Sequence, residues 1–438
     1  MATTIDLVLK QVAEQDIRFV QLWFTDLLGS LKSIEIPASE LEHALKEGIG
    51  FDGSSIHGFA RIDESDMLAI PDLSTFVVLP WDNVGRLICD IRLPGGKPYE
   101  GDPRRVLRRA IERAASIGLE MVVGTELEYF YFSSNQQPEG VDVAGYFDLS
   151  PQDSAAEIRR ETVTAIKDIG IPINAAHHEV APSQQEIDLR HDTVLRSADA
   201  LMTCRYAVKQ IAIRNGVHAT FMPKPLSSEN GSGLHVHQSL IRSDGGNAFF
   251  DPTDTLHLSS VAHRYLAGLL HHAPEIIGLC AQWVNSFKRL VPGFEAPVYV
   301  TWASRNRSNM IRIPMYEAGK EGATRIEFRA PDPACNPYLA FAVMLQAGLE
   351  GIEQDMPLPN PVERDVFAMS ATERKDAGIK ILPGSLNEAI IAMEDSELVR
   401  KALGDHIFDK FIENKRIEWD SYRAHVHAYE LERYLPVL

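Results

Sequence analysis

The sequence contains few cysteines and has fewer basic than acidic residues. Its four cysteines, Cys89, Cys204, Cys280 and Cys335, are scattered over 438 residues and form no C-x-x-C pair. This pattern argues against a disulfide framework or a zinc site and fits a reducing compartment such as the cytoplasm. Lysine and arginine number 43 against 61 aspartates and glutamates, which gives a formal net charge of -18. Such a chain has no basic surplus for a nucleic-acid backbone or an anionic membrane surface.

Several signals of common protein classes are also missing. No apolar run of about 18 residues occurs, so no membrane-spanning helix is expected. Residues 1–24 predict an amphipathic helix and then a strand, without the apolar core and cleavage site of a signal peptide. The phosphate-binding motif G-x-x-x-x-G-K-S/T and the protein-kinase signatures do not occur. We therefore expect a cytoplasmic protein that uses neither of the commonest nucleotide-binding folds.

The length of 438 residues favours two domains, one small and one large. The Gly/Pro-rich stretch at 93–104 is the best linker candidate, and it predicts domains over residues 1–101 and 102–438. The first domain shows one helix and four strand patterns. The second alternates strands and helices and ends in a mostly helical part.

Two helices of the second domain have clear start signals. Asn336 stands as N-cap before Pro337 at the first helical position. Ser385 and Glu388 have the spacing of a capping box, in which each side chain accepts from the other residue's backbone N–H. Both signals predict where these helices begin.

Some predicted strands carry charged side chains on one face only. In "GTELEYFYF", residues 124–132, Glu126 and Glu128 share a face because alternate side chains of a strand point the same way. Four later segments repeat the pattern. They are "HHEVAPSQQEIDLRH" at 177–191, "GSGLHVHQSL" at 231–240, "NRSNMIRIP" at 306–314 and "RIEFRAP" at 325–331. Their polar positions are Glu179, Glu186, Asp188, His235, His237, Ser239, Arg312, Arg325, Glu327 and Arg329.

Strands with one apolar face and one face of functional groups predict a sheet whose concave polar side lines a cavity. The plain alternative is a half-solvated antiparallel sheet, whose outer face is naturally charged. We favour the cavity because the polar positions hold glutamate, histidine and arginine but hardly any lysine. A solvated face would mix arginine with lysine.

Five glutamates of this predicted cavity would repel one another and take up protons unless cations joined them. They are Glu126, Glu128, Glu179, Glu186 and Glu327, with His235 as a neutral nitrogen donor. Carboxylates with one imidazole favour Mg²⁺ or Mn²⁺ over zinc, and two such ions would offset most of the charge. Paired hard cations beside arginines suit phosphoryl transfer. The residues thus predict a two-metal, ATP-dependent transferase or ligase, with a binuclear metallohydrolase as the alternative.

Six motifs resemble those of the type I glutamine synthetase family, in the family's order and spacing. They are "FDGSSIHGFARIDESDM" (51–67), "HHEVAPSQQE" (177–186), "FMPKPLSSENGSGLHVH" (221–237), "NSFKRLVPGFEAP" (285–297), "NRSNMIRIP" (306–314) and "RIEFRAPDPACNPYL" (325–339). The resemblance implies an α+β fold with a small N-terminal β-grasp domain. It also implies a large catalytic domain with a curved, mainly antiparallel sheet backed by helices. The expected assembly is a homo-dodecamer of two hexameric rings, with active sites between neighbouring subunits.

The implied activity is that of a glutamate–ammonia ligase. Glutamate's side-chain carboxylate would attack ATP to give γ-glutamyl phosphate, and ammonia would then displace phosphate. One Mg²⁺ or Mn²⁺ ion, nearer the nucleotide, would be bound by Glu126, His235 and Glu327. A second ion, nearer glutamate, would be bound by Glu128, Glu179 and Glu186.

The resemblance also implies catalytic residues. Asp52 of a neighbouring subunit would help to deprotonate ammonium, in a pocket completed by Tyr146, Ser55 and Glu179. Glu295 would close over the site and exclude water from the acyl phosphate. From the sequence alone, Asp52 could instead cap a turn, Glu295 could be a solvated loop residue, and Tyr146 could belong to the core.

The remaining implied roles concern substrate and nucleotide. Arg289, Arg307 and Arg329 would hold the substrate carboxylate and the phosphate, and Asn230, Gly231 and Gly233 would bind glutamate. The nucleotide-binding residues would be His237, Ser239, Arg307, Arg312 and Arg325. Arg61 matches an arginine linked to feedback inhibition by glutamine, although it could equally be a surface arginine.

The chain departs from the family pattern in places. Phe287 and Phe294 stand where many relatives have tyrosine, "GLCAQWVNSF" lacks a usual Thr-Asn-Pro run, and the stretch at 315–325 differs. Such changes occur in relatives that join glutamate to polyamines or other amines, so a glutamate–amine ligase is the alternative. We favour ammonia because the acidic, ammonium-sized pocket with Asp52 and Tyr146 is kept.

Two further expectations follow from single positions. Phe367 occupies the place of a tyrosine that is adenylylated in some relatives, and a phenyl ring has no hydroxyl to modify. That modification is therefore not expected. A retired family member with a structural role would have lost metal ligands, and none is lost here.

Overall fold

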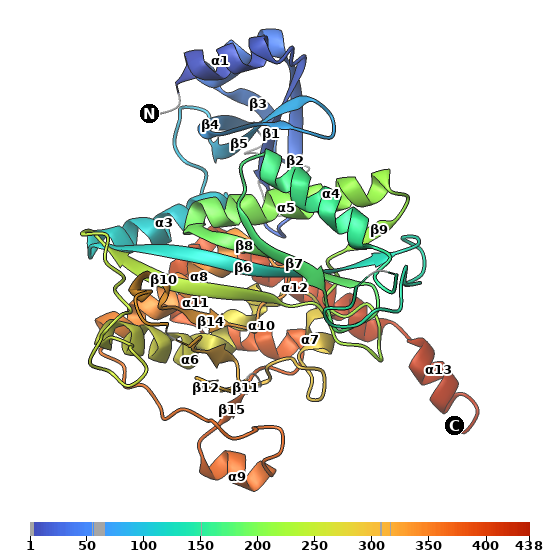
Figure 1. Ribbon diagram of the computed structural model, residues 1–438, viewed down its shortest axis with the longest axis vertical. Helices are drawn as coiled ribbons and strands as arrows, with labels where there is room; N and C mark the ends of the chain where they lie inside the picture. The colour runs from blue at the N-terminus through green and yellow to red at the C-terminus, as the bar shows by residue number, and fades with distance from the viewer. Residues whose placement is uncertain (1–3, 55, 57–65, 150, 307–308, 316) are drawn as a thin grey trace.

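The structure of the protein is a computed structural model that describes residues 4–54, 56, 66–149, 151–306, 309–315 and 317–438. A small N-terminal domain sits on a larger body, and the C-terminal helix α13 (Ala428–Tyr434) projects away from that body (Figure 1). None of the described helices combines the length and the apolar character that a membrane crossing requires.

The N-terminal domain is a five-stranded sheet with two helices packed on it. In order across the sheet, the strands are β2 (Leu31–Pro37), β1 (Phe19–Thr25), β5 (Val84–Arg92), β4 (Asp66–Leu79) and β3 (Ile49–Asp52). β1 and β5 run parallel and the other neighbours antiparallel, in agreement with the expected β-grasp domain. Helices α1 (Ile5–Glu14) and α2 (Leu41–Glu47) contribute Val8, Val12 and Leu41 to its core.

All four strands predicted in this domain are present, but β3 was not predicted. Its four residues, IGFD, are too few to show an alternating pattern. The omission matters because β3 carries Asp52 at its end.

The larger domain is built on an eight-stranded, mainly antiparallel sheet. Its path is β12 (Trp302–Ala303), β13 (Ile311–Arg312), β14 (Ile326–Phe328), β10 (Leu234–Arg242), β6 (Leu119–Phe132), β8 (Gln184–Thr193) and β7 (Ile173–His178), and β9 (His218–Thr220) pairs with β6. Within the described strands of this sheet, β12 and β13 are the parallel pair. The five charged segments of the sequence therefore lie on strands of a single sheet, as predicted.

Helices cover the apolar face of this sheet. Alternate residues of β6, among them Val123, Leu127 and Tyr129, enter the core shared with helix α5 (Val194–Arg214), whereas Glu126 and Glu128 line a cavity on the other face. The helices of this domain are α3 (Pro103–Ser116), α4 (Ala156–Asp168), α5 (Val194–Arg214), α6 (Ser260–Cys280), α7 (Ser286–Arg289), α8 (Pro337–Glu353), α9 (Ala371–Asp376), α10 (Leu386–Glu394), α11 (Glu397–Leu403), α12 (Asp405–Ala424) and α13.

The predicted helix starts agree with the structure, with one correction. Asn336 caps α8 by accepting from the N–H of Tyr338 at 3.1 Å. Ser385 caps α10 by accepting from the N–H of Glu388 at 3.2 Å. The Glu388 carboxylate, however, accepts from the N–H of Gly384 at 2.8 Å, so the reciprocal bond of the capping box is made one residue earlier. The four cysteines are free and buried.

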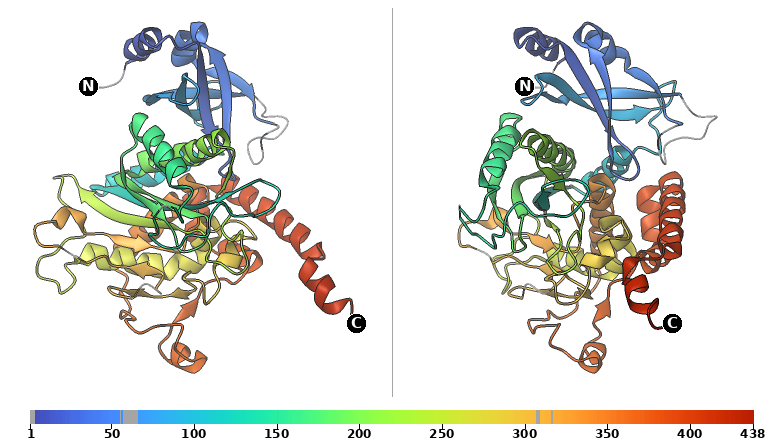
Figure 2. Two further views of the ribbon diagram at one scale, coloured as in Figure 1. Left: turned by 45° about the vertical axis from the view of Figure 1, so that its right-hand side comes forward. Right: turned by 90° about the vertical axis from the view of Figure 1, so that its right-hand side faces the viewer.

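A buried ion network joins the two domains. Arg104 of α3, whose side chain is 3% exposed, bonds to Asp90 at 2.6 Å and Asp72 at 2.9 Å from the N-terminal sheet, and to Asp199 of α5 at 2.8 Å. The Trp23 ring of β1 also packs edge-on against a tyrosine of α5. The N-terminal domain thus rests on α5, on the apolar side of the larger sheet (Figure 2). The boundary at residue 101 stays a prediction.

Candidate active site

A cavity of about 1500 Å³ lies on the polar face of the larger sheet. Strands β6, β8, β10, β13 and β14 line it with Glu126, Glu128, Glu186, Asp188, His235, Arg312 and Glu327. Loops and the short helix α7 add Tyr146, Glu179, Asn230, Gly231, Arg289, Glu295 and Arg329. All six residues predicted as metal ligands therefore line one cavity.

Glu126 is held between two histidines of the neighbouring strand. His235 lies opposite Glu126 in the register, with its Nδ1 2.7 Å from Oε2, and Nε2 of His237 lies 2.7 Å from Oε1. Burial alone would raise the pKa of Glu126, but these hydrogen bonds outweigh it and hold that pKa far below its ordinary value. Because ionised Glu126 only accepts, His235 donates through Nδ1 and keeps a lone pair on Nε2. That Nε2 faces Oε1 of Glu128 at 3.8 Å, and a cation would fit between these two electron-rich atoms.

Further acidic side chains of the cavity wall, those of Glu128, Glu179, Glu186 and Asp188, form a second group beside Glu126 and its two histidines. Burial, followed by repulsion from Glu128 and Glu126, raises the pKa of Glu186. Burial likewise raises the pKa of Glu128, of Glu179 and of Asp188. One oxygen of Glu128 is nevertheless well held, by the side-chain amide of Gln184 at 3.0 Å and a backbone N–H at 2.8 Å. A positive charge placed among these acids would offset their mutual repulsion and lower these pKa values.

The same group contains atoms that lack a donor. His177 lies with Nδ1 3.1 Å from the carbonyl of His178, so its Nε2 lone pair faces Oε1 of Glu186 at 3.2 Å. Oδ1 of Asp188 is buried without a hydrogen-bond partner in the described part of the chain. One donor atom each of His177, Glu186 and Asp188 lies within 4.8 Å of the others, and the same holds for Glu126, His237 and Glu327. The first set has the chemistry of a site for a hard divalent cation, whereas in the second both ring nitrogens of His237 already have partners, Glu126 and Arg325.

Arginines supply positive charge on another part of the wall. The fully buried Glu327 accepts from Arg312 and, at 2.5 Å, from Arg329. Burial opposes ionisation of Glu327, but Arg329 and its neighbours hold its pKa below the ordinary value. Nε of Arg329 is buried and has no hydrogen-bond partner among the described residues. Arg289 instead donates to the carbonyls of residues 329–331, so it braces the wall in this conformation.

The loop at 230–233 approaches the acidic residues through its backbone. A Cβ at Gly233 would lie 2.7 Å from an Arg289 nitrogen and 3.1 Å from Nε2 of His235. A Cβ at Gly231 would lie 2.3 Å from the carbonyl oxygen of Pro223. The backbone carbonyl excludes a side chain at Gly231, and a side chain at Gly233 would have to displace the Arg289 guanidinium group; the N–H of Gly233 donates to Glu128 at 2.8 Å.

Two loop residues with implied roles also reach the cavity. Tyr146 is 46% exposed and stacks on Phe147, with ring centroids 3.9 Å apart, so it is not a core residue. Glu295 follows the turn at Pro292 and Gly293 with a φ of 52°. A non-glycine residue in this region of φ carries backbone strain, a feature concentrated at functional loops.

Some predicted site residues lie elsewhere. Those outside the cavity lining are Asp52, Gly233, His237, Ser239 and Arg325. Asp52 is exposed on β3, and its Oδ1 accepts from the backbone N–H of Ser54 at 2.8 Å. Hydrogen bonding from Ser54 holds the pKa of Asp52 below its ordinary value. Its side chain caps a turn there, which is the structural role named above as the alternative to a catalytic one. Arg325 donates through Nε to His237 at 3.2 Å, beside the cavity. Ser55, Arg61 and Arg307 lie outside the described residues.

His177 and Phe367 are among the lining residues that the sequence did not indicate. His177 was part of a recognised motif, but a single histidine before Glu179 gave no sign of facing Glu186. Phe367 lines the cavity and packs edge-on against Tyr299, with centroids 5.6 Å apart. His177 lies on β7 opposite Glu186 in the register, but the sequence of that strand shows no alternation of polar and apolar residues, and Phe367 lies outside the strands of the sheet.

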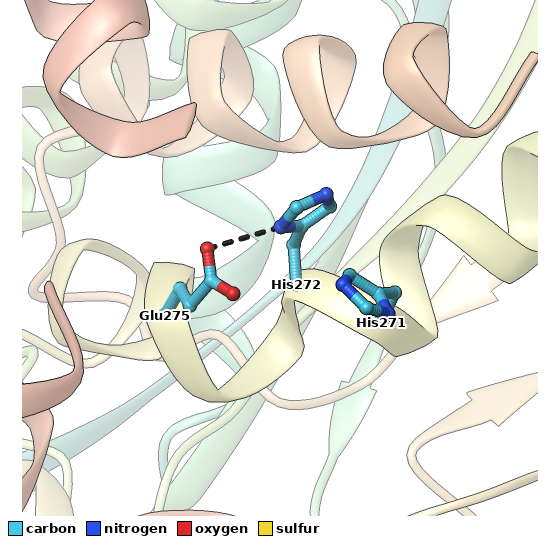
Figure 3. Close-up of side chains that lie close together, drawn as sticks. All are labelled: His271, His272 and Glu275. Carbon is cyan, nitrogen blue, oxygen red and sulfur yellow. Dashed lines mark hydrogen bonds and ion pairs between the residues drawn. The ribbon is translucent and has the colours of Figure 1, made fainter. Parts of the chain in front are cut away.

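A histidine-rich cluster on α6 lies outside this cavity (Figure 3). Nδ1 of His272 is 3.0 Å from Glu275, which also accepts from Ser396, while His271 is exposed beside them. Glu275 is thus already paired within the fold, and we assign the cluster no part in the site.

Two family models match the chain over most of its length. "Glutamine synthetase, beta-Grasp domain" matches residues 16–94, and "Glutamine synthetase, catalytic domain" matches residues 100–434. The glutamine synthetase of Mycolicibacterium smegmatis is 49% identical over 440 residues, with 98% of each chain covered. That of Methanosarcina mazei is 50% identical over 444 residues, with 100% of this chain and 98% of the other covered.

Solved structures show the same likeness. The ADP complex of GmaS matches with a TM-score of 0.90 at 31% identity, covering 99% of this chain and 100% of that chain. The glutamine synthetase of Plasmodium falciparum matches with a TM-score of 0.89 at 26% identity, covering 99% of both chains.

Proposed function

The chain belongs to the glutamine synthetase family and is an ATP-dependent, glutamine-forming ligase, and we propose that its polar cavity carries out this reaction. The observation that supports the proposal most is the composition of the cavity wall. Carboxyl groups with raised pKa values face histidine lone pairs, and arginines stand beside them. Such a wall suits two divalent cations and a transferring phosphoryl group.

The family is generally dependent on ATP and divalent metal, and the residues present fit Mg²⁺ or Mn²⁺. The proposed ligands nearer the nucleotide are Glu126, His235 and Glu327, and those nearer glutamate are Glu128, Glu179 and Glu186. Asp188 supports the fit, because its buried Oδ1 lacks a partner within the described residues. When bound, the ions would polarise phosphate oxygens and offset the charge of the transferring group.

The proposed reaction has two steps. Glutamate's side-chain carboxylate attacks the γ-phosphorus of ATP, and ADP leaves. Ammonia then attacks the acyl carbon of γ-glutamyl phosphate, the C–O bond to phosphate breaks, and glutamine and phosphate are released. The unpartnered Nε of Arg329 can donate to a substrate oxygen. Glu295 closes the cavity against water.

We propose that Asp52 acts in the cavity of a neighbouring copy. Within one chain it lies on the N-terminal domain, which rests on α5 on the apolar side of the larger sheet, and it does not line the cavity. Its lowered pKa makes Asp52 a weaker base than an ordinary aspartate, so its proposed part is to hold ammonium by charge and to take up the proton only as the amine attacks. A ring assembly, expected as a dodecamer, would bring it to the site.

The four free, buried cysteines support a cytoplasmic location.

The test compares amine acceptors with purified protein, ATP, Mg²⁺ and glutamate. Phosphate release that saturates with ammonium and does not respond to putrescine or spermidine is expected. Release that responds only to the polyamines would instead favour the glutamate–amine ligase. The relatives near 49% identity, all named glutamine synthetase, favour ammonia over that alternative.

A further inference from the structure

We propose that Lys224 is a positioning residue that links the glutamate-side loop at 229–233 to the loop carrying Glu295. The inference rests on the proposed function, since that function gives both loops their roles. Lys224 lies between β9 and β10, and it is 7% exposed. A buried lysine needs specific partners for its ammonium group.

The backbone of Lys224 is fixed in place by one side chain. Its N–H donates to Oδ1 of Asn285 at 2.8 Å, and its carbonyl accepts from Nδ2 of Asn285 at 3.0 Å. Both backbone groups of the residue are therefore satisfied by a single amide. The starting point of the lysine side chain is set relative to α7, at whose N-terminus Asn285 stands.

The ammonium group of Lys224 touches both loops at once. Nζ donates to the carbonyl of Glu229, directly before Asn230. It also lies 3.4 Å from the centroid of the Phe294 ring, directly before Glu295. A cation over the face of an aromatic ring is attracted by the negative charge of that face.

The adjoining residue holds the first loop a second time. The carbonyl of Pro223 accepts from the N–H of Ser232 at 2.8 Å. Pro223 and Lys224 thus hold the two ends of the loop at 229–233. Of these two residues, Lys224 is the one that contacts the ring of Phe294. A displacement of the loop on binding glutamate would move the ammonium group and with it the position of Phe294 and Glu295.

The consequence concerns water. When the Glu295 loop is not held, water can take the place of ammonia at the acyl carbon of γ-glutamyl phosphate. The C–O bond to phosphate then breaks and glutamate and phosphate are returned, so ATP is consumed without glutamine. Lys224 would suppress this loss by holding the loop closed when glutamate is bound.

The experiment measures glutamine formed per phosphate released, together with KM for glutamate and kcat. Lys224→Met and Phe294→Leu should each lower the ratio by about two- to fivefold, the order expected for loss of one such contact. Lys224→Arg and Phe294→Tyr keep the cation and the ring, and both should retain the ratio. The double variant Lys224→Met/Phe294→Leu should be no worse than the poorer single variant, because both changes remove the same contact.

An unchanged ratio in Lys224→Met, or double-variant losses that multiply, would overturn the proposal. Phe294→Leu tests the same contact from the exposed loop if Lys224→Met fails to fold. The unsubstituted protein separates the two hypotheses. If it forms no glutamine, the proposed function fails; if it does and the variants keep its ratio, only the role of Lys224 fails.

Discussion

Replacing Glu186 with glutamine should leave the metal-free protein at least as stable as the unsubstituted protein, yet weaken its response to Mg²⁺. Glu186 is buried among other acids, and burial and repulsion raise its pKa, so the metal-free fold keeps this carboxyl group protonated at neutral pH. Glutamine resembles that neutral form in size and polarity. It cannot, however, supply the charge that a divalent cation requires.

The pH dependence gives the size of the effect. The pKa of this carboxyl group in the folded protein lies above its ordinary value of 4.5. The group therefore contributes its full free energy of stabilisation below pH 4.5, and this contribution is lost as the pH rises through the folded-state pKa. Each such group contributes a slope of at most about 1.4 kcal/mol per pH unit in this window. Between pH 6 and pH 8, Glu186→Gln should therefore gain up to about 2.7 kcal/mol relative to the unsubstituted protein. A tenfold loss of Mg²⁺ affinity would remove about 1.4 kcal/mol of metal-induced stabilisation.

Urea unfolding in EDTA at pH 6 and pH 8, followed by Mg²⁺ titration, measures both quantities at fixed protein concentration. Glu432→Gln is the matched control, because Glu432 is exposed near the C-terminus. A Glu186→Gln protein that is less stable in EDTA and keeps the original pH slope would refute the proposed protonation of Glu186 in the metal-free fold. Full Mg²⁺ stabilisation in that variant would refute the ligand assignment.

Three further predictions concern the shared site, the domain contact and the glycine loop. Asp52→Ala should lose ammonium-dependent turnover but retain ATP binding, and mixed assembly with an inactive Glu327→Ala chain should restore activity; absence of recovery would contradict a shared site. Arg104→Met leaves buried Asp199 without its arginine partner, while Asp72 and Asp90 keep Arg108, and it should cost about 3–5 kcal/mol in urea unfolding, whereas a loss below about 1 kcal/mol would show that the network adds little. Gly233→Ala should abolish activity without unfolding the chain, because its Cβ meets Arg289 and His235, while Gly322→Ala, with nothing within 4 Å, should stay active; equal activity of the two would refute the close-approach argument.

Much of the site could be predicted because it follows the alternation of strands. Glu126 and Glu128 on β6, and His235 on β10, face one side for the same local reason, and the apolar residues between them fill the core. The N-cap at Asn336 was equally local. Such features depend on the nearest few residues, and the sequence displays them directly.

Other parts depend on contacts between distant segments. The role of Arg289 in bracing residues 329–331 is visible only when α7 is placed beside the end of β14. The contact of Lys224 with Phe294 joins residues 70 positions apart through a loop. β3 was too short for a periodic signal, and Asp52 could not be placed relative to the cavity without it. Packing between elements, rather than local propensity, decided each of these features.

The most direct test of the proposed ligase mechanism follows the oxygen atoms of glutamate. The protein is incubated with ATP, Mg²⁺, ¹⁵N-ammonium and glutamate that carries ¹⁸O in its side-chain carboxylate. We expect ¹⁵N in the glutamine side chain and one ¹⁸O from glutamate in each phosphate released, because the carboxylate oxygen becomes the bridge to phosphorus. Phosphate whose new oxygen comes from water, without labelled glutamine, would contradict the ligase mechanism and indicate a hydrolase instead.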